Sequence, residues 1–454
     1  MNIVVIGGSP KGEKSVTMQY VQYLKNNADD TNFIEHFVAK NIRNYENDEG
    51  VFNDFLLDVK KADAVLWAFP LYFALVHGSY KRFIELLFER KAGDIFMGKH
   101  CALLATSIHF FDHTAIEYMR GISEDLGMIV DEVHSAHMND LMQKEGEEQL
   151  KKFWDIWRLK IKEDVQAGRL SLPIKYTSKK LKLSKARVST KRKGLKVGIV
   201  TESGISENLD AMVACLNEEF EETEIFDLST MKILGGCLGC LKCGYENHCV
   251  YEGKDEVIDT YRKLKDCNAL VFAGTIRDRY LTSRWKTFID RLFFSTHIPF
   301  FDQKVIAFLI SGPLQQLPNL RELLTGFFEA DGLSIAGIVT DEEDRIEKKI
   351  EGLAISLERY CKDGYRPPRM FIGEGGHLIF RDSVYGGLRG VFVADHKYYK
   401  KNKLYDFPQK DWGTRLSGSM LSLMMKIPFI RREIQNNMPD YMIRSYAKII
   451  NKKR

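Results

Sequence analysis

The sequence predicts an α/β protein with two tandem domains, each built on a doubly wound parallel sheet, followed by a mostly helical basic extension. Its 454 residues exceed what one hydrophobic core usually organises, which indicates more than one domain. Short apolar runs alternate with helical patterns in both halves, as in sheets whose strands are joined by crossover helices. The most informative observation is that one half repeats the other.

The repeat emerges when the chain is aligned with itself. Residues 62–88 ("ADAVLWAFPLYFALVHGSYKRFIELLF") align without gaps on residues 267–293 at a shift of 205, and residues 98–107 find their match at the same shift. The first apolar run, residues 2–10, matches the second copy at a shift of 194. The eleven extra residues fall where the second copy carries a cysteine-rich segment. We infer a duplicated domain whose second copy has gained a cysteine hairpin.

Within each copy the apolar runs predict strands buried on both faces, such as "IVVIGG", "DAVLWAFP" and "CALLATS" in the first copy. Amphipathic patterns such as "SVTMQYVQYLKNN" and "SYKRFIELLFERK" predict the helices between them. We therefore expect domains at residues 1–165 and 195–364, a basic linker at 166–194 and a basic extension at 365–454.

Composition narrows the protein class. With 44% hydrophobic and 28% charged residues, the chain is typical of a globular protein. No apolar run is long enough to span a membrane, and the N-terminus resembles a first strand rather than a signal peptide. We therefore expect a cytoplasmic protein with reduced thiols. In such a compartment, clustered cysteines indicate a metal site or redox chemistry more than a disulfide framework.

Two segments are strongly basic. Ten of the 22 residues from Lys175 to Lys196 are Lys or Arg, and none is acidic. Tyr176 is the only aromatic residue there, so we expect a tether and no nucleic acid binding. In the extension, two amphipathic helices separated near Pro428 and Pro439 are compatible with peripheral membrane contact, packing over the domains or a dimer contact.

The loop "GGSPKGEKSVT" (7–17) follows the first predicted strand and opens the first predicted helix. Backbone N–H groups at a helix start, hydroxyl groups and Lys11 together predict an anion site. The loop is neither a dinucleotide fingerprint nor a Walker loop. The alternative is a plain strand-to-helix turn in which Ser15 caps the helix.

This loop resembles the Gly-Ser-Pro-(Arg/Lys)…Ser/Asn-Thr phosphate loop of the flavodoxin-like NAD(P)H-dependent FMN reductases, and "FPLYFALVHGSYKRFIE" resembles a second segment of that family. The resemblance covers roughly residues 1–160 and 195–360. It implies an FMN phosphate site, a turn against the isoalloxazine ring and a third loop nearby. The residues implied are, for the phosphate, Ser9, Lys11, Ser15, Val16 and Thr17; for the ring, Pro70, Leu71, Tyr72 and Phe73; and for the third loop, Thr106, Ser107 and His109.

Two regions depart from the family pattern. The third loop is Gly-rich in most members, but here it carries His109, Phe110 and Phe111, which we expect to narrow the space above a ring. The second copy has Glu202 and no basic residue in its phosphate loop. It also has Arg277 where Tyr72 stands, either to bind an anion or to pair with an acidic residue. The first copy is therefore the expected flavin site, and a second flavin stays open.

The cysteine segment "CLGCLKCGYENHC" has the spacing C-x2-C-x2-C-x5-C. Closely spaced thiols with glycines between them suit an iron–sulfur cubane, whereas a four-thiolate zinc site more often pairs two separated knuckles. The motif also resembles that of the iron–sulfur flavoproteins, a branch of the same family, which implies a [4Fe–4S] cluster. Zinc and free redox thiols remain alternatives. The four candidate ligands are Cys237, Cys240, Cys243 and Cys249.

Together these features predict a flavin-dependent electron-transfer enzyme. FMN in the first domain accepts electrons from NAD(P)H or a reduced carrier, and a cluster in the second domain passes them to a small-molecule or protein acceptor. The hypothesis places the cysteine hairpin against Pro70–Phe73. One alternative is an NAD(P)H:acceptor reductase for quinone, nitro or azo compounds without a cluster, and another is a non-enzymatic docking module. The resemblance also implies a dimer. No catalytic residue is assigned, but Tyr72 and His109 are expected near the ring.

Overall fold

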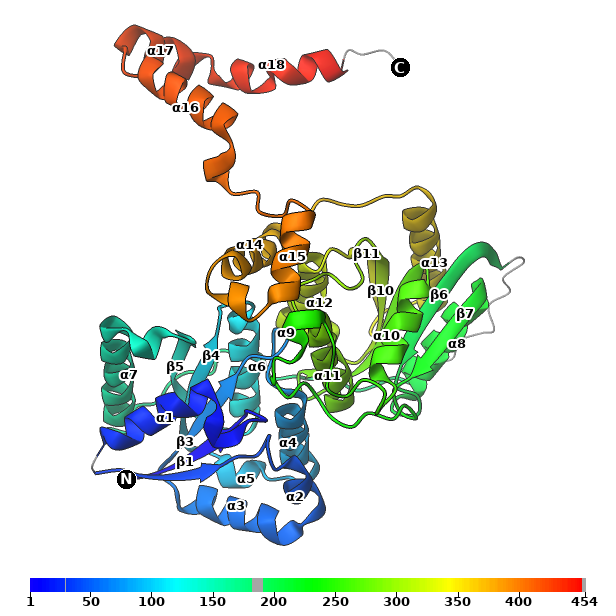
Figure 1. Ribbon diagram of the computed structural model, residues 1–454. Coiled ribbons are helices and arrows are strands. Elements are labelled where there is room, and N and C mark those ends of the chain that lie inside the picture. The colour runs from blue at the N-terminus through cyan, green and yellow to red at the C-terminus, as the bar shows by residue number, and fades with distance from the viewer. Residues whose placement is uncertain (29, 182–190, 451–454) are drawn as a thin grey trace. The chain divides into compact units, whose positions relative to one another are not determined.

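The computed structural model describes residues 1–28, 30–181 and 191–450, which form two compact units, Met1–His396 and Lys397–Arg454. The core of the predicted linker, residues 182–190, lies outside the described residues. In the first unit the chain forms two parallel sheets covered by helices (Figure 1). The fold class predicted from the sequence is confirmed.

The first sheet has the strand order β2-β1-β3-β4-β5, with all neighbours parallel. Helices connect the strands as the alternating pattern predicts. The strands are β1 (Asn2–Gly7), β2 (Asn32–His36), β3 (Ala64–Pro70), β4 (His100–Ser107) and β5 (Ile129–His137), and the helices are α1 (Val16–Asn26), α2 (Ile42–Asn47), α3 (Glu49–Lys61), α4 (Gly78–Glu89), α5 (Gly93–Phe96), α6 (Asp112–Asp125) and α7 (Lys144–Lys162).

The second sheet repeats this order as β7-β6-β8-β10-β11, and a short antiparallel strand, β9, is added beside β8. The order agrees with the duplication, because β3 corresponds to β8 and β4 to β10. The elements are β6 (Arg192–Thr201), β7 (Phe220–Asp227), β8 (Ala269–Arg277), β9 (Tyr280–Leu281), β10 (Val305–Ser311) and β11 (Ser334–Thr340), with α8 (Glu207–Glu218), α9 (Cys243–Glu246), α10 (Val257–Asp266), α11 (Ser283–Asp290), α12 (Pro318–Ala330) and α13 (Ile346–Lys362).

The extension is more helical than the two predicted helices suggest. α14 (Phe371–Tyr385) packs against α12 in the first unit, and α15 (Val393–Lys401) contains the boundary between the units. The second unit holds α16 (Trp412–Met424), α17 (Pro428–Asn436) and α18 (Met438–Ile450). Pro428 begins α17 and Pro439 lies in the first turn of α18, where proline is tolerated.

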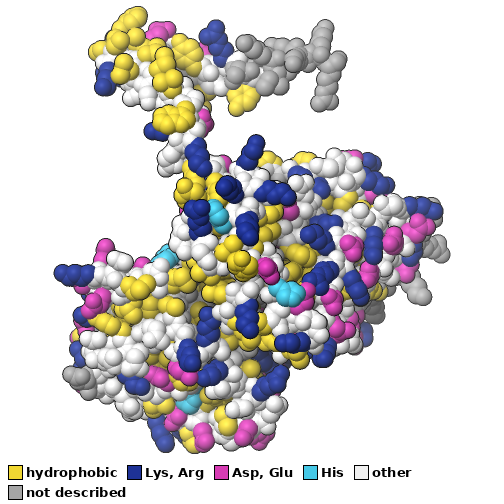
Figure 2. All heavy atoms as spheres, in the orientation of Figure 1, with side chains coloured by type: hydrophobic (Ala, Val, Ile, Leu, Met, Phe, Trp, Pro, Cys, Tyr) yellow, Lys and Arg dark blue, Asp and Glu magenta, His cyan; other side chains and the backbone are white. Residues whose placement is uncertain are grey.

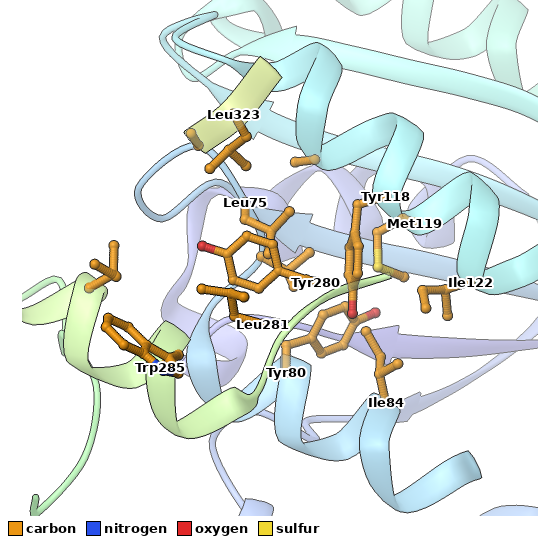
Figure 3. Packing of buried hydrophobic residues seen from close by; sticks show 14 of the residues in the cluster. Leu75, Tyr80, Ile84, Tyr118, Met119, Ile122, Tyr280, Leu281, Trp285 and Leu323 are labelled. Carbon is orange, nitrogen blue, oxygen red and sulfur yellow. The ribbon is translucent and has the colours of Figure 1, made fainter. Parts of the chain in front are cut away.

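One hydrophobic core runs through both halves of the first unit. Tyr80 and Tyr118 from the first half share a buried cluster with Tyr280, Leu281 and Trp285 from the second (Figure 3). The two tyrosine rings at 118 and 280 meet edge to face, with centroids 6.4 Å apart. The halves are thus joined by interior packing, the kind of contact that holds obligate dimers together.

Candidate functional site

The loop between β1 and α1 lies at the carboxyl end of the first sheet and presents an anion cradle. Ser15 caps α1 by accepting a backbone N–H of the first turn, and Ser9 Oγ accepts the N–H of Lys11 at 3.2 Å. The Thr17 and Thr106 hydroxyls are 2.6 Å apart and buried, which ties the loop to the end of β4. Lys11 is exposed beside the unpaired N–H groups of the helix start.

Gly8 allows this loop to lie close against β3. A Cβ on Gly8 would lie 2.8 Å from Phe69 Cβ and 3.1 Å from the Tyr80 ring, a distance that real Cβ atoms do not reach without displacement. The Gly8 N–H donates to the Ala68 carbonyl at 2.8 Å. The close approach explains why a glycine precedes the serine of the loop.

The turn after β3 faces the same edge of the sheet. The Leu71 N–H donates to the Thr106 carbonyl, and Tyr72 and Leu75 exchange backbone hydrogen bonds at 2.8 and 3.2 Å. Pro70, Leu71 and Tyr72 are each half-buried. The turn therefore presents a partly apolar wall next to the anion cradle, the combination that a flavin mononucleotide needs.

Aromatic residues near this wall bind the second half of the unit. The Phe73 ring packs against Phe293 and Phe327, with centroids 5.9 and 5.4 Å away. Phe110 packs against Phe327 and, at 4.2 Å, against Phe380 of α14. Phe110 thus contacts α12 of the second copy and α14 of the extension; that it also narrows the space above a ring stays a prediction. Phe73 as a ring contact stays a prediction.

In the third loop, His109 lies at the surface and Ser107 is half-buried. His109 is exposed, its N–H donates to Ser107 Oγ at 2.8 Å, and its Nδ1 lies 2.8 Å from an Asp112 carboxylate oxygen. Partial burial alone would raise the pKa of Asp112, but hydrogen bonds from His109 and Ser135 hold that pKa below its ordinary value. Phe111, in contrast, is buried and directly precedes α6.

Across the contact between halves, two buried lysines are related by the repeat. Lys81 of α4 donates to the Arg277 carbonyl at 2.8 Å, and Lys286 of α11 donates to the Tyr72 carbonyl at the same distance. Residues 81 and 286 are repeat equivalents, and so are residues 72 and 277. The lysine of each half therefore fixes a turn of the other half. Lys286 fixes the turn at Tyr72, which we call the ring turn, and Lys81 fixes its counterpart at Arg277. The halves pack as a pseudo-symmetric dimer within one chain.

The acidic partners of these lysines obey the same symmetry. Glu85 accepts the Ser283 N–H at 2.6 Å, while Asp290 accepts the Gly78 N–H at 2.8 Å, so each carboxylate caps the start of the opposite helix. Glu85 lies 3.2 Å from Lys81 Nζ. The side chains of Lys286 and Asp290 are paired and fully buried. Arg277 itself pairs with a facing carboxylate, Glu89, at 2.7 Å.

The cysteine loop lies against two residues that the sequence predicts for the flavin site, Tyr72 and Lys11. A Cβ at Gly239 would fall 2.5 Å from the Tyr72 hydroxyl and 3.2 Å from Lys11 Nζ, so only a glycine, here with φ +60°, fits. Burial, with nearby Cys237 and Asp290, raises the pKa of Tyr72 and keeps its hydroxyl protonated. The loop thus touches both the anion cradle and the ring turn.

His77 links the two halves at this point. Its Nδ1 accepts the Ser79 N–H at 3.1 Å as the cap of α4, which leaves Nε2 to carry the proton and donate to the Cys237 carbonyl at 3.0 Å. The ring lies edge-on to Tyr72, with centroids 4.9 Å apart. His77 is buried, and burial lowers its pKa, which agrees with the neutral form.

All four cysteines of the segment line one small cavity, together with Arg291, Tyr251 and Phe293. Cys237 Sγ accepts the Gly239 N–H at 3.4 Å, a contact that favours a thiolate. In the metal-free protein, burial raises the pKa of Cys237 and of Cys243 to about 12. These thiols hold their protons unless a metal displaces them.

The four thiols are suitable ligands for a metal ion or an iron–sulfur cluster. The cavity between them, however, is too small for such a group. The cavity among the cysteines has a volume of about 20 Å³, room for a single water. Within residues 1–28, 30–181 and 191–450, no three His, Cys, Asp or Glu side chains are already arranged around one metal ion. A cluster therefore requires the cysteine side chains to open outward.

The corresponding site of the second half is bordered by an additional segment of the chain. A cavity of about 380 Å³ at the end of the second sheet is lined by Ser206, Thr275 and Ser311, and also by Tyr176 and Lys180 of the segment that precedes β6. The Ser206 and Ser311 hydroxyls are 2.8 Å apart and mirror the threonine pair of the first half. Its loop at residues 201–210 has no basic residue, and the Lys180 side chain that lines the cavity is paired with Glu207.

Hydrogen bonds hold that segment in the second site. The Asn208 side chain bonds the backbone of Lys179 and Leu181 at 2.9 Å each, and the Tyr176 hydroxyl lies 3.1 Å from an Asp341 carboxylate oxygen. The tether expected from the sequence therefore crosses the second copy's binding edge. This arrangement favours one flavin site per chain.

The sequence interpretation missed His77, Lys286 and Asp290 as site-forming residues. The repeat pairs Lys81 with Lys286, and both lysines interrupt the apolar face of an amphipathic helix. A lysine at the same apolar position in both copies could have indicated a buried ion pair, because a lysine is almost never fully buried unless it is paired. His77 carried no comparable signal, because its role depends on a contact with a residue 160 positions away.

Several solved structures are similar to parts of this chain. An NADH:FMN oxidoreductase (EMOB) in its apo form is 22% identical, with 35% of this chain and 88% of that chain covered and a TM-score of 0.31. The NAD(P)H:acceptor oxidoreductase FerB from Paracoccus denitrificans is 17% identical over 35% of this chain and 97% of its own, with a TM-score of 0.28. An azoreductase from Bacillus anthracis str. Sterne is 16% identical over 37% and 98%, with a TM-score of 0.27.

No curated protein matches the chain. The profile of the NADPH-dependent FMN reductases matches it twice, over residues 1–133 and 197–338, which together make up more than half of its length. The two matched segments coincide with the two parallel sheets, and the first contains the anion cradle and the ring turn. The chain therefore belongs to the NADPH-dependent FMN reductase family and is an FMN-containing NAD(P)H oxidoreductase.

Proposed function

We propose that the first half binds a single FMN, reduced by NAD(P)H or a reduced carrier, and that the cysteine loop of the second half holds a [4Fe–4S] cluster. One observation carries the proposal: the cysteine loop contacts Tyr72, Lys11 and His77, the residues that surround the flavin site. A flavin exchanges one or two electrons and a cluster exchanges one, so their proximity would let two-electron donors feed one-electron acceptors.

The chain's own residues would act by binding and positioning. Lys11 and the start of α1 neutralise the FMN phosphate, with Ser9, Ser15, Val16 and Thr17 around it. Pro70, Leu71 and Tyr72 form the wall for the ring, and Lys286 fixes that wall through the Tyr72 carbonyl. Because the Tyr72 hydroxyl stays protonated, it can donate a hydrogen bond toward the ring edge.

The second half would take the place that a partner subunit has in a two-chain dimer. Its cysteine loop and α11 reach the first site, while its own site is crossed by residues 176–181. The reduced thiols of the loop favour the cytoplasm as the compartment. Small molecules or redox proteins with access to the cysteine loop would be the acceptors; Cys240 is exposed there.

A second candidate function is reduction of quinone, nitro or azo acceptors directly by the flavin, with the cysteines as structural thiols. The closed 20 Å³ cavity favours this candidate. It requires the acceptor to reach the flavin itself, past His109, an exposed side chain at that edge. The two candidates share the FMN site and differ in what the cysteine loop holds.

The test is purification without oxygen, followed by an absorption spectrum and assays for iron and acid-labile sulfide. We expect one FMN and about four irons per chain, with a broad absorbance that dithionite bleaches. The Cys240→Ser variant should lose the iron and keep the flavin. Cys361→Ser, which changes a half-buried cysteine outside the loop, should keep both.

Each outcome identifies what the cysteine loop binds. Flavin without iron in the unaltered protein would refute the cluster and favour the direct acceptor reductase. One equivalent of zinc without sulfide would assign a structural metal site. Absence of flavin from the unaltered protein, with no rebinding of added FMN, would refute the flavin site itself.

A further inference from the structure

The second unit, Lys397–Arg454, presents apolar side chains that its own helices do not cover. No residue of α16 or α17 is buried. Trp412, Leu423, Phe429 and Met442 are each between 68% and 78% exposed. A segment of this length normally buries such residues away from water, so these helices require an apolar partner outside their own unit.

The exposed apolar residues of α16 follow the helical repeat. Trp412, Leu416, Met420 and Leu423 recur every three or four residues, which places them on one face of the helix. Figure 2 shows hydrophobic side chains gathered along the visible face of the C-terminal helices, with Lys and Arg side chains beside them. Helices α16 and α17 are therefore amphipathic.

The charge of the segment specifies the partner further. Residues 397–454 contain 14 Lys and Arg against 4 Asp and Glu, a net charge of +10, whereas the whole chain has only +4. Residues 1–396 therefore carry a net charge of −6. The positive charge is concentrated on the part of the chain that exposes the apolar helix faces, so its partner is expected to be anionic as well as apolar.

The length of the described helices excludes that any of them spans a membrane. Among these, no helix is both long enough and apolar enough to cross a bilayer. The helices α16, α17 and α18 span 13, 9 and 13 residues, against about 20 for a spanning helix. Short amphipathic helices with Trp and Tyr on the apolar face and Arg beside it instead lie in the plane of the interface.

We propose that α16–α18 form a lipid-binding surface that holds this oxidoreductase on an anionic bilayer. The apolar faces enter the boundary between headgroups and acyl chains, and the cationic side chains, such as Arg415, Arg431 and Arg432, meet the lipid phosphates. Arg415 also lies over the Trp412 ring at 4.8 Å, which places a charged group at the edge of the apolar face.

The experiment is vesicle co-sedimentation of the full-length, flavin-loaded protein. Vesicles of phosphatidylcholine alone are compared with vesicles that contain phosphatidylcholine and phosphatidylglycerol, at low and high salt. We expect binding to the anionic vesicles that weakens at least tenfold at high salt, because screening removes the electrostatic part. Binding to the neutral vesicles should be much weaker.

Two substitutions test whether the apolar faces of α16–α18 bind the bilayer. Phe429→Ser should reduce binding to anionic vesicles at least tenfold, whereas Phe371→Ser, which alters an 89% exposed phenylalanine of α14 in the first unit, should leave it unchanged. Flavin content and thermal stability report whether each variant is folded.

Other occupants of the apolar face give distinct results. Equal binding of both variants would overturn the assignment to α17, and absence of binding to either kind of vesicle would overturn the lipid surface. Sedimentation of the lipid-free protein as a dimer that Phe429→Ser dissociates would assign the face to a second copy of the chain instead. Failure of the proposed cluster would not affect any of these outcomes.

Discussion

At the scale of single residues, the pair Lys81 and Lys286 shows how the two halves depend on each other. Both side chains are fully buried, and each donates to a backbone carbonyl of the opposite half. Burial lowers the pKa of each lysine, and the paired carboxylate opposes that effect. Such ion pairs contribute little when intact, but removal of one partner leaves an uncompensated buried charge.

We therefore expect Lys286→Met to destabilise the protein by about 3–5 kcal/mol, since Asp290 loses its counter-ion and the Tyr72 carbonyl loses its donor. Urea denaturation monitored by tryptophan fluorescence measures the change. Lys348→Met, at an exposed position on α13, serves as the control and should cost less than about 0.5 kcal/mol. Equal effects of the two changes would refute the role of the buried pair.

A pH dependence follows from His134. Burial lowers the pKa of His134, with Asp140 opposing, and its ring packs against Phe153 at 5.2 Å. The unfolded chain then binds a proton below about pH 6.5 that the folded protein does not bind, so stability falls as the pH falls through that value. We expect a lower free energy of unfolding at pH 5.5 than at pH 7.5, and a smaller difference in His134→Gln. An unchanged difference in the variant would exclude His134 as a source.

At the scale of elements, the contact of α4 with α11 joins the two halves of the first unit. The sequence predicted both helices, their strands and the repeat that relates them, because hydrophobic periodicity and self-similarity are local properties. It did not predict that Phe110 packs against α14, and it placed the cysteine hairpin against Pro70–Phe73 only by analogy with the dimers of the family; the contact of Gly239 with Tyr72 agrees with that hypothesis. Those contacts depend on how two halves dock, and no local pattern encodes the register of a docked surface.

Gly78, the first residue of α4, tests this contact. A Cβ there would lie 2.5 Å from Thr287 Oγ1 and 3.0 Å from the Thr287 backbone in α11. Gly78→Ala should therefore separate the helices and lower stability by about 1–3 kcal/mol. Gly93 is the first residue of α5, and a Cβ added there would meet no atom within 4 Å, so Gly93→Ala should be neutral or slightly stabilising. Thermal denaturation of both variants gives the comparison, and similar melting temperatures would contradict the tight contact.

At the scale of the whole molecule, duplication has produced two sheets whose carboxyl edges resemble each other but differ in function. The first edge keeps Lys11 in its loop, while the second has Ile205 at the place that the repeat assigns to this lysine. The second edge is also crossed by the chain itself. One half is thus specialised for the cofactor, and the other supports it.

We expect Lys11→Ile, which copies the second edge, to weaken FMN binding roughly tenfold to a hundredfold, since a charge-assisted bond to the phosphate is worth about 1.5–3 kcal/mol. Lys14→Ile, three residues later, should leave the affinity nearly unchanged. Fluorescence titration of the flavin-free protein measures both dissociation constants and the stoichiometry. A stoichiometry of two would show that the second edge also binds FMN.

The docking of the halves has a further consequence for the protein in dilute solution. Two-chain assemblies come apart as their concentration falls, because association is a second-order process. Here the ring turn of one half and the lysine that holds it lie on the same polypeptide, so their effective concentration is fixed by the covalent connection. The contacts that complete the flavin site should therefore persist at any dilution, and activity per chain should not depend on how much enzyme is present.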